Sequence, residues 1–268
     1  FKMPRQKSQT HRVVADIRED AAKAVAARLG HNASAFVCDV ANGASVQALV
    51  DYTTQTFGSP NIVVNNAGVT HVNKPMLDVN EAEFDRVYSI NVKSIFHMAH
   101  AVVPLMRKAG GGVILNVGSV AGIRPRPGLT WYNGSKAAVN ILSKSMAVEL
   151  GPDKIRVNAI CPVMGETGMF TQFMGLPDTP ENRAKFVSTI PLGRFCEPKD
   201  MAAAASKIAE KRTSAVPAEK FKSGDNEYVF ITPVFMFKKK RIIAEDALLD
   251  QALLDELVKC GAGTIKKV

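Results

Sequence analysis

A tyrosine and a lysine stand four positions apart in the stretch WYNGSK, as Tyr132 and Lys136. On an α-helix this spacing places both side chains on one face, a turn apart. A free phenol has a pKa near ~10 and is a poor base at neutral pH, unless a nearby cation stabilises the phenolate. The pair is therefore a candidate proton-transfer device, although the same spacing also occurs on many exposed helices.

Short β-branched runs alternate with longer helical patterns over most of the chain. We expect strands at 11–17, 34–40, 61–68, 111–119 and 155–161, and helices at 19–30, 44–57, 81–108 and 130–150. Runs with apolar residues at successive positions suit strands that are covered on both faces. The sequence therefore predicts an α/β fold with a doubly wound, Rossmann-like parallel sheet, and such sheets bind ligands at the carboxyl ends of their strands.

Further motifs stand at the expected strand ends. They are NNAG at 65–68, Asn91 in SINV, and Ser119 in NVGSVAG, which precedes Tyr132 by 13 residues. Together with YNGSK they resemble the classical short-chain dehydrogenases/reductases over residues 12–205. The resemblance implies an oxidoreductase that transfers hydride between a nicotinamide and a secondary alcohol or ketone.

The resemblance also implies a role for each residue of this set. Tyr132 transfers the proton, Lys136 stabilises the phenolate and binds the nicotinamide ribose, and Ser119 holds the substrate oxygen. Asn91 holds a water that connects Lys136 to solvent. The residues taken alone leave ordinary alternatives open: Ser119 as a strand-end hydroxyl, and Asn91 as a helix-interior amide bonded to the backbone.

The expected cofactor is NAD rather than NADP. Asp16 ends the strand that contacts the adenosine ribose in the family, and a carboxylate there accepts hydrogen bonds from both ribose hydroxyls and repels a 2′-phosphate. Arg18 argues weakly for NADP, because it can pair with a phosphate. Asp39 resembles the family's contact to adenine. The remaining expected cofactor contacts are Asn66, Ala67, Gly68, Lys136, Pro162 and Thr167.

Both ends of the chain depart from the family pattern. In the family a first strand, a TGxxxGxG loop and a helix precede the strand at 12–16, and the loop amides cradle the pyrophosphate. Here FKMPRQKSQT stands at that place and contains no glycine. We therefore expect a fold without its first strand and glycine loop, and unpaired edges on the strands at 12–16 and 61–65.

The expected division of the chain follows these departures. Residues 1–11 form an atypical basic segment, 12–205 the Rossmann-like core, and 206–268 a divergent C-terminal segment with an amphipathic helix at 244–260. The helix either packs on its own domain, covers a sheet edge or recruits a partner. Arginines at 124 and 126, in IRPRPGLTWY, either meet an anionic group of the substrate or lie at the surface.

Composition and charge exclude several classes of function. The net charge is +9, but the excess lies at the two ends and not along one face, so we expect no nucleic-acid partner. The four cysteines form no CxxC pair, which indicates a reducing, cytoplasmic compartment and no metal site. The longest apolar run, 228–237, is too short to span a membrane.

Two functions remain open at this level. The catalytic set favours an NAD-dependent oxidoreductase, expected to be a homo-oligomer, that acts on a small-molecule alcohol or ketone. The missing glycine loop favours a cofactor-poor relative that acts as a pseudo-enzyme or binding protein, or a truncated or mispredicted chain. The segment 163–195 resembles the family's substrate lid, and its phenylalanines and methionines either line an adaptable apolar pocket or serve as ordinary packing of the lid.

Overall fold

The computed structural model describes residues 10–165, 168–209, 220–230, 234–237, 240–243, 247–248, 250–260 and 265–267. The chain divides into two compact units, Phe1–Ala209 and Glu210–Val268. Each unit has a hydrophobic core of its own, because the core clusters of one contain no residue of the other.

The first unit alternates strands and helices in the expected order. Its strands are β1 (Arg12–Asp16), β2 (Ala33–Val37), β3 (Ile62–Asn65), β4 (Gly112–Val117) and β5 (Ile155–Ile160). Its helices are α1 (Glu19–Leu29), α2 (Gly43–Phe57), α3 (Glu81–Tyr88), α4 (Ser94–Lys108), α5 (Thr130–Leu150), α6 (Phe170–Met174), α7 (Pro180–Val187) and α8 (Pro198–Ala209). All the sheet pairings among these strands are parallel, and the predicted Rossmann-like α/β fold is therefore confirmed.

The parallel sheet of this unit is divided. β1 pairs only with β2, whereas β3, β4 and β5 form a separate three-stranded sheet, so β1 and β3 each keep one edge that no described strand pairs. Apolar side chains are exposed beside these edges: Ile17 is 65% exposed after β1, and Val64 is 54% exposed on β3. Parallel strands are normally covered. The structure thus has the unpaired edges that the sequence predicts.

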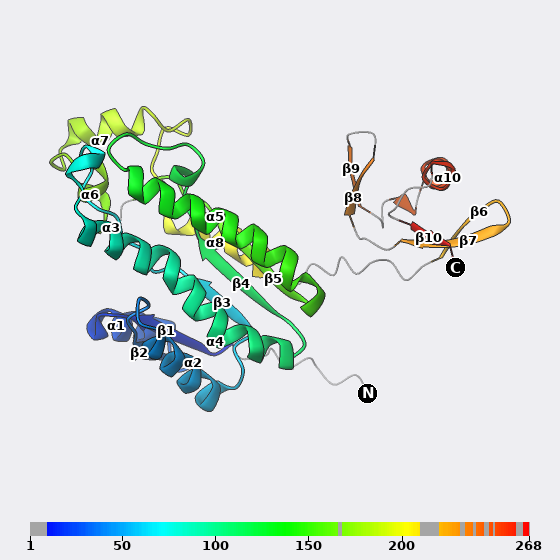
Figure 1. Cartoon of the computed structure of the whole chain (residues 1–268), viewed down its shortest axis with the longest axis horizontal. Coiled ribbons are helices and arrows are strands. Elements are labelled where there is room, and N and C mark those ends of the chain that lie inside the picture. The colour runs from blue at the N-terminus through cyan, green and yellow to red at the C-terminus, as the bar shows by residue number, and fades with distance from the viewer. Residues whose placement is uncertain are drawn as a thin grey trace. The chain divides into compact units, whose positions relative to one another are not determined.

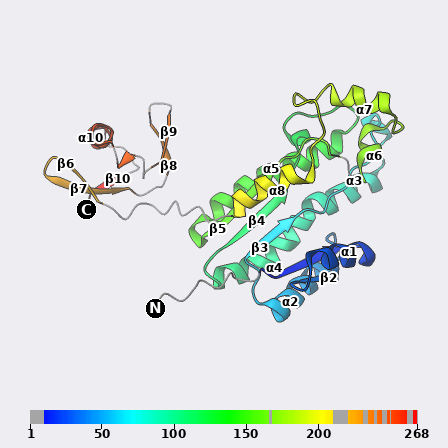
Figure 2. The same cartoon turned by 180° about the vertical axis from the view of Figure 1, so that it is seen from behind.

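The two sheets are connected through α2 and α4, which pack against each other. Val46 and Val50 of α2 lie in one cluster with Val102 and Met106 of α4 and with buried residues of β4 and β5. Figures 1 and 2 show α5 on one face of β4 and β5 and α8 on the opposite face. This covering explains why β4 is buried along most of its length, and it makes β4 a rigid support for the residues that follow it.

The expected long helix at 81–108 is interrupted. α3 and α4 are joined by a π-helical turn, Ser89–Lys93, and α3 begins with a capping box formed by Asn80 and Glu83. Such turns insert an extra residue into a helix and often occur at functional sites. The prediction of one regular helix is wrong here because the turn is held by contacts of Asn91 with distant segments, which the helical periodicity does not report. Asn91 lies in this turn and is buried.

The described residues of the second unit include short antiparallel strands and helix α10 (Gln251–Lys259). β6 (Phe221–Ser223), β7 (Asn226–Phe230) and β10 (Ile265–Lys267) form a sheet in the order β10-β7-β6, and β8 (Val234–Phe237) pairs with β9 (Lys240–Ile243). Helix α10 buries Leu254 and Leu257 against Phe221 of β6. Of the alternatives for the amphipathic helix, packing on its own unit is the one observed. Residues 244–246 and 249 of the predicted helix lie outside the described residues.

Candidate active site

Ser119 is positioned directly after β4. Its Oγ accepts a hydrogen bond from the amide of Ala121 at 3.1 Å and so begins the short turn Val120–Gly122. Gly122 lets this turn lie against α5, because a Cβ there would come within 2.5 Å of the backbone nitrogen of Ala137. Gly122 is therefore needed for the close packing of this turn on α5. That packing brings Ser119 beside the helix that carries Tyr132 and Lys136.

Tyr132 lies in the first turn of α5 and is 5% exposed. Burial raises the pKa of its phenol, and a hydrogen bond with Ser119 opposes that rise. A buried phenol is costly to ionise, so Tyr132 carries its proton at neutral pH. In this state the phenol can donate its proton, and the hydroxyl of Ser119 lies near enough to affect its pKa.

Lys136 lies one turn further along α5 and is 4% exposed. Its Nζ donates a hydrogen bond to the carbonyl oxygen of Val117 at 2.8 Å. Burial lowers the pKa of Lys136 to about 8. The NNAG turn approaches the same amine, since a Cβ on Gly68 would lie 3.2 Å from Nζ. The ends of β3 and β4 therefore meet at Lys136.

Asn91 connects the turn after β3 with α5. Its Oδ1 accepts a hydrogen bond from the amide of Val69 at 2.8 Å, and its Nδ2 donates to the carbonyl oxygen of Val69 and to Oγ of Ser135, both at 2.9 Å. Ser135, which the sequence analysis did not single out, donates to the carbonyl oxygen of Tyr132 at 2.8 Å. The position of Ser135 between Tyr132 and Lys136, inside the motif YNGSK, is the feature of the sequence that could have identified it. The water beside Lys136 stays a prediction.

Two carboxylates stand at the carboxyl ends of the neighbouring strands β1 and β2. Asp16 ends β1, and its Oδ1 accepts a hydrogen bond from the amide of Arg18 at 2.9 Å and lies 3.7 Å from Nε of the same arginine. Asp39 follows β2, and its Oδ1 accepts from the amide of Ala41 at 2.9 Å. Arg18, the residue that argued for NADP, therefore contacts the carboxylate of Asp16.

The other expected cofactor contacts divide between two strand ends. Asn66 and Ala67 are exposed in the turn after β3, and Gly68 is half-buried. Pro162 follows β5, and its carbonyl oxygen accepts a hydrogen bond from the amide of Val120 at 3.1 Å, which joins this strand end to the turn after Ser119. Thr167 lies outside the described residues.

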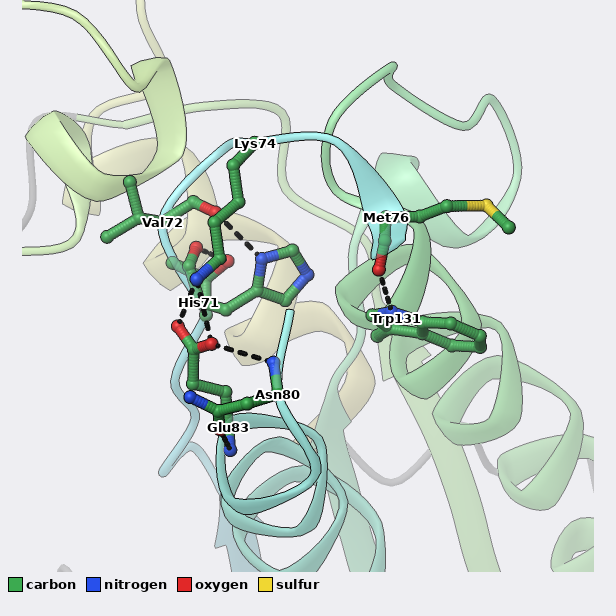
Figure 3. A network of polar contacts seen from close by, with 8 residues as sticks. His71, Val72, Lys74, Met76, Asn80, Glu83 and Trp131 are labelled. Atoms are coloured by element: carbon green, nitrogen blue, oxygen red, sulfur yellow. Dashed lines mark hydrogen bonds and ion pairs between the residues drawn. The ribbon is translucent and has the colours of Figure 1, made fainter. Parts of the chain in front are cut away.

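A polar network holds the segment between β3 and α3 in place (Figure 3). Nζ of Lys74 donates to both carboxylate oxygens of Glu83, at 2.8 and 2.9 Å. Glu83 also accepts from the amide of Asn80 at 3.1 Å, as part of the capping box. The carboxylate of Glu83 thus holds the loop through Lys74 and also caps the N-terminus of α3.

The same segment fixes the start of α5. Nε1 of Trp131 donates to the carbonyl oxygen of Met76 at 3.1 Å (Figure 3), and its ring meets Phe84 of α3 edge-on, with the ring centroids 5.5 Å apart. Because Trp131 directly precedes Tyr132, these contacts hold the helical turn that carries the phenol. The tryptophan of WYNGSK is therefore a positioning residue.

The described residues include no group of three or more His, Cys, Asp or Glu side chains that could hold a metal ion. Within the same part of the chain, no helix has the length and apolar character needed to cross a membrane. The polar groups that meet at this strand end are the hydroxyls of Ser119 and Tyr132 and the amine of Lys136.

Comparison with known proteins agrees with this geometry. Residues 6–222 match the family described as enoyl-(acyl carrier protein) reductase. The chain is 49% identical over 179 residues to 4-formylbenzenesulfonate dehydrogenase of Comamonas testosteroni, covering 67% of this chain and 71% of that one. It is 38% identical over 210 residues to 7alpha-hydroxysteroid dehydrogenase of Escherichia coli K12, covering 77% and 80%.

A solved structure is also similar. The 3-ketoacyl-(acyl-carrier-protein) reductase from Brucella melitensis, complexed with NADH, aligns with a TM-score of 0.71 and 38% sequence identity, over 76% of this chain and 82% of that one. Two of these relatives are dehydrogenases and one is a reductase. The comparisons thus give no support to a cofactor-poor binding protein.

Proposed function

The chain belongs to the short-chain dehydrogenase/reductase family and is a nicotinamide-dependent oxidoreductase, and from this premise we propose that Ser119, Tyr132 and Lys136 perform the proton transfer. The observation that carries the proposal is that Ser119, Tyr132 and Lys136 are all buried at the carboxyl end of β4, with the Ser119 hydroxyl near enough to the phenol to affect its pKa. Two hydroxyls that lie together beside a strand end can both donate to a single substrate oxygen.

The residues have distinct tasks in this proposal. The bound nicotinamide supplies or accepts the hydride. In the reductive direction Tyr132 gives its proton to the carbonyl oxygen, and the Ser119 hydroxyl keeps that oxygen in place. Lys136, whose burial lowers its pKa to about 8, is still mostly charged at neutral pH and stabilises the phenolate left behind. Asn91 holds Ser135 and the turn after β3, and so positions α5.

The residues at the strand ends can bind the nucleoside parts of a dinucleotide. Asp16 and Asp39 lie at the ends of adjacent strands, where a nucleoside can bind, and the absence of a side chain at Gly68 leaves space beside Lys136. Asp16 supports NAD rather than NADP, because its charge repels a 2′-phosphate. Asn66, Ala67, Pro162 and Thr167 complete the proposed contacts. A small alcohol or ketone as substrate, a homo-oligomeric state and a cytoplasmic location belong to the same proposal.

Tyr132→Phe tests the proposed proton donor. The variant keeps the ring, which packs edge-on against Phe173 at a centroid distance of 5.5 Å, and loses only the hydroxyl. Reduction of benzaldehyde and cyclohexanone, followed by the absorbance of NADH, is expected to slow by about two to four decades with an unchanged unfolding midpoint. Tyr52→Phe on α2 is the matched control. Wild-type turnover by the Tyr132 variant would remove this residue from catalysis.

A further inference from the structure

Arg126 has an unusual environment for an arginine on a loop. Its guanidinium carbon lies 4.2 Å from the ring centroid of Phe186 on α7 and 5.9 Å from that of Phe173 on α6. The side chain is partly buried, and this burial lowers the pKa of Arg126. Arg124, two positions earlier on the same loop, is exposed. The two arginines therefore differ in their surroundings although they share one sequence motif.

The ion pairs among the described residues include none to Arg126, and burial is the cause that lowers its pKa. Other arginines of this unit are paired: Arg107 with Asp153, and Arg194 with Asp200. A guanidinium that is partly removed from water gains from the faces of aromatic rings. Those rings leave its planar set of N–H donors available for an anion.

The backbone that carries Arg126 is fixed. The carbonyl oxygen of Arg126 accepts a hydrogen bond from Nδ2 of Asn133 on α5 at 2.8 Å. The following two carbonyl groups are also bonded: that of Pro127 to Nδ2 of Asn73 at 3.2 Å, and that of Gly128 to the amide of Lys74 at 3.0 Å. A charge on a loop anchored in this way is preorganised, so little conformational freedom is lost when an anion binds.

Arg126 lies near the catalytic phenol. The ring of Phe173 contacts both: its centroid is 5.5 Å from that of Tyr132 and 5.9 Å from the guanidinium carbon of Arg126. Two consecutive contacts therefore connect the proton donor with the cation. Phe173 and Phe186 form an aromatic surface beside Arg126, with their ring centroids 6.3 Å apart. Such a surface favours a flat, aromatic molecule.

We propose that Arg126 determines substrate specificity by binding the carboxylate or sulfonate group of an aromatic aldehyde or alcohol, whose ring lies against Phe173 and Phe186. The position of the reacting carbon at Tyr132 rests on the function proposed above, whereas the anion site itself does not. A neutral aromatic substrate gains the ring contacts but leaves the guanidinium without its anion. An aliphatic acid gains the ion pair but not the aromatic surface.

A binding experiment tests the anion site without turnover. The full chain is titrated calorimetrically with 4-methylbenzenesulfonate and 4-methylbenzoate, and with the neutral 4-methylbenzenesulfonamide. We expect Arg126→Gln to weaken binding of both anions by roughly tenfold to a hundredfold, the usual range for a hydrogen bond to a charged group. Binding of the sulfonamide is expected to change little. Arg124→Gln is the matched control and is expected to bind all three compounds as the wild type does.

A turnover experiment then separates this inference from the proposed function. With NADH, Arg126→Gln is expected to lower kcat/KM for 4-carboxybenzaldehyde but not for benzaldehyde. If neither aldehyde is reduced by the wild type while the anions still bind through Arg126, the proposed function fails and the anion site stands.

Two results overturn the anion site. One is equal affinity of the wild type for the sulfonate and the sulfonamide. The other is an equal loss of anion affinity in Arg124→Gln and Arg126→Gln, which would leave Arg126 only a packing role. If Arg126→Gln does not fold, Arg126→Lys and Arg124→Lys give the same comparison, because lysine keeps the charge but not the planar donors.

Discussion

Replacement of Lys136 by methionine tests whether this amine is buried without a counter-charge. Its side chain is 4% exposed, and its pKa is lowered from 10.5 to about 8, with burial as the main cause. Below pH 8 the amine is protonated in both the folded and the unfolded chain, so the cost of burying the charge is fully present. Between pH 8 and about 10.5 the folded chain releases the proton first, because its pKa is the lower one. The stability of the wild type therefore rises with pH over this window.

The magnitude follows from the size of the pKa change. A difference of one pKa unit corresponds to about 1.4 kcal/mol, so the change from 10.5 to about 8 corresponds to roughly 3 kcal/mol over the whole window. At pH ~9.5 about 2 kcal/mol of this should be recovered, before the tyrosines ionise. The Lys136→Met variant has no amine to titrate and lacks this rise.

Urea unfolding at pH ~7 and ~9.5 measures the effect. The free energy of unfolding of the wild type, relative to Lys136→Met, is expected to increase by about 2 kcal/mol between the two values. Lys144→Met, on the exposed side of the same helix, is the matched control. A difference between wild type and Lys136→Met that does not change with pH refutes the reasoning, because it means that the ammonium is solvated or neutralised by an anion.

Two further predictions concern the cofactor. The wild type is expected to have a higher kcat/KM with NAD than with NADP, and Asp16→Ala to weaken or reverse that preference; comparable values for the wild type with both cofactors contradict it. The 268-residue polypeptide is expected to bind NAD about two to four decades more weakly than a variant with an added strand, glycine loop and helix before residue 12, because two charge-assisted hydrogen bonds to the pyrophosphate contribute roughly 3–6 kcal/mol. Calorimetry that finds micromolar binding without the addition, and no improvement with it, shows that another segment holds the phosphates.

The fold class and the catalytic pair could be predicted from local sequence. β-branched runs and helical periodicity report backbone preferences that act within a few residues, and they place β1, β4 and α5 to within about two residues of the observed bounds. The shared face of Tyr132 and Lys136 follows from helix geometry alone. The unpaired edges of β1 and β3 were also predictable, because the mostly polar stretch FKMPRQKSQT, which has no glycine, is not expected to form a buried central strand.

Other features depend on contacts between distant segments. The π-helical turn that buries Asn91 exists because the Asn91 side chain bonds both to Val69, 22 residues away, and to Ser135 on α5. Nothing in IRPRPGLTWY distinguishes Arg124 from Arg126. Only the packing of α6 and α7 over the loop leaves one guanidinium in water and places the other on two aromatic rings. Burial and the local dielectric are tertiary properties, and they decide which of two identical side chains is prepared to bind an anion.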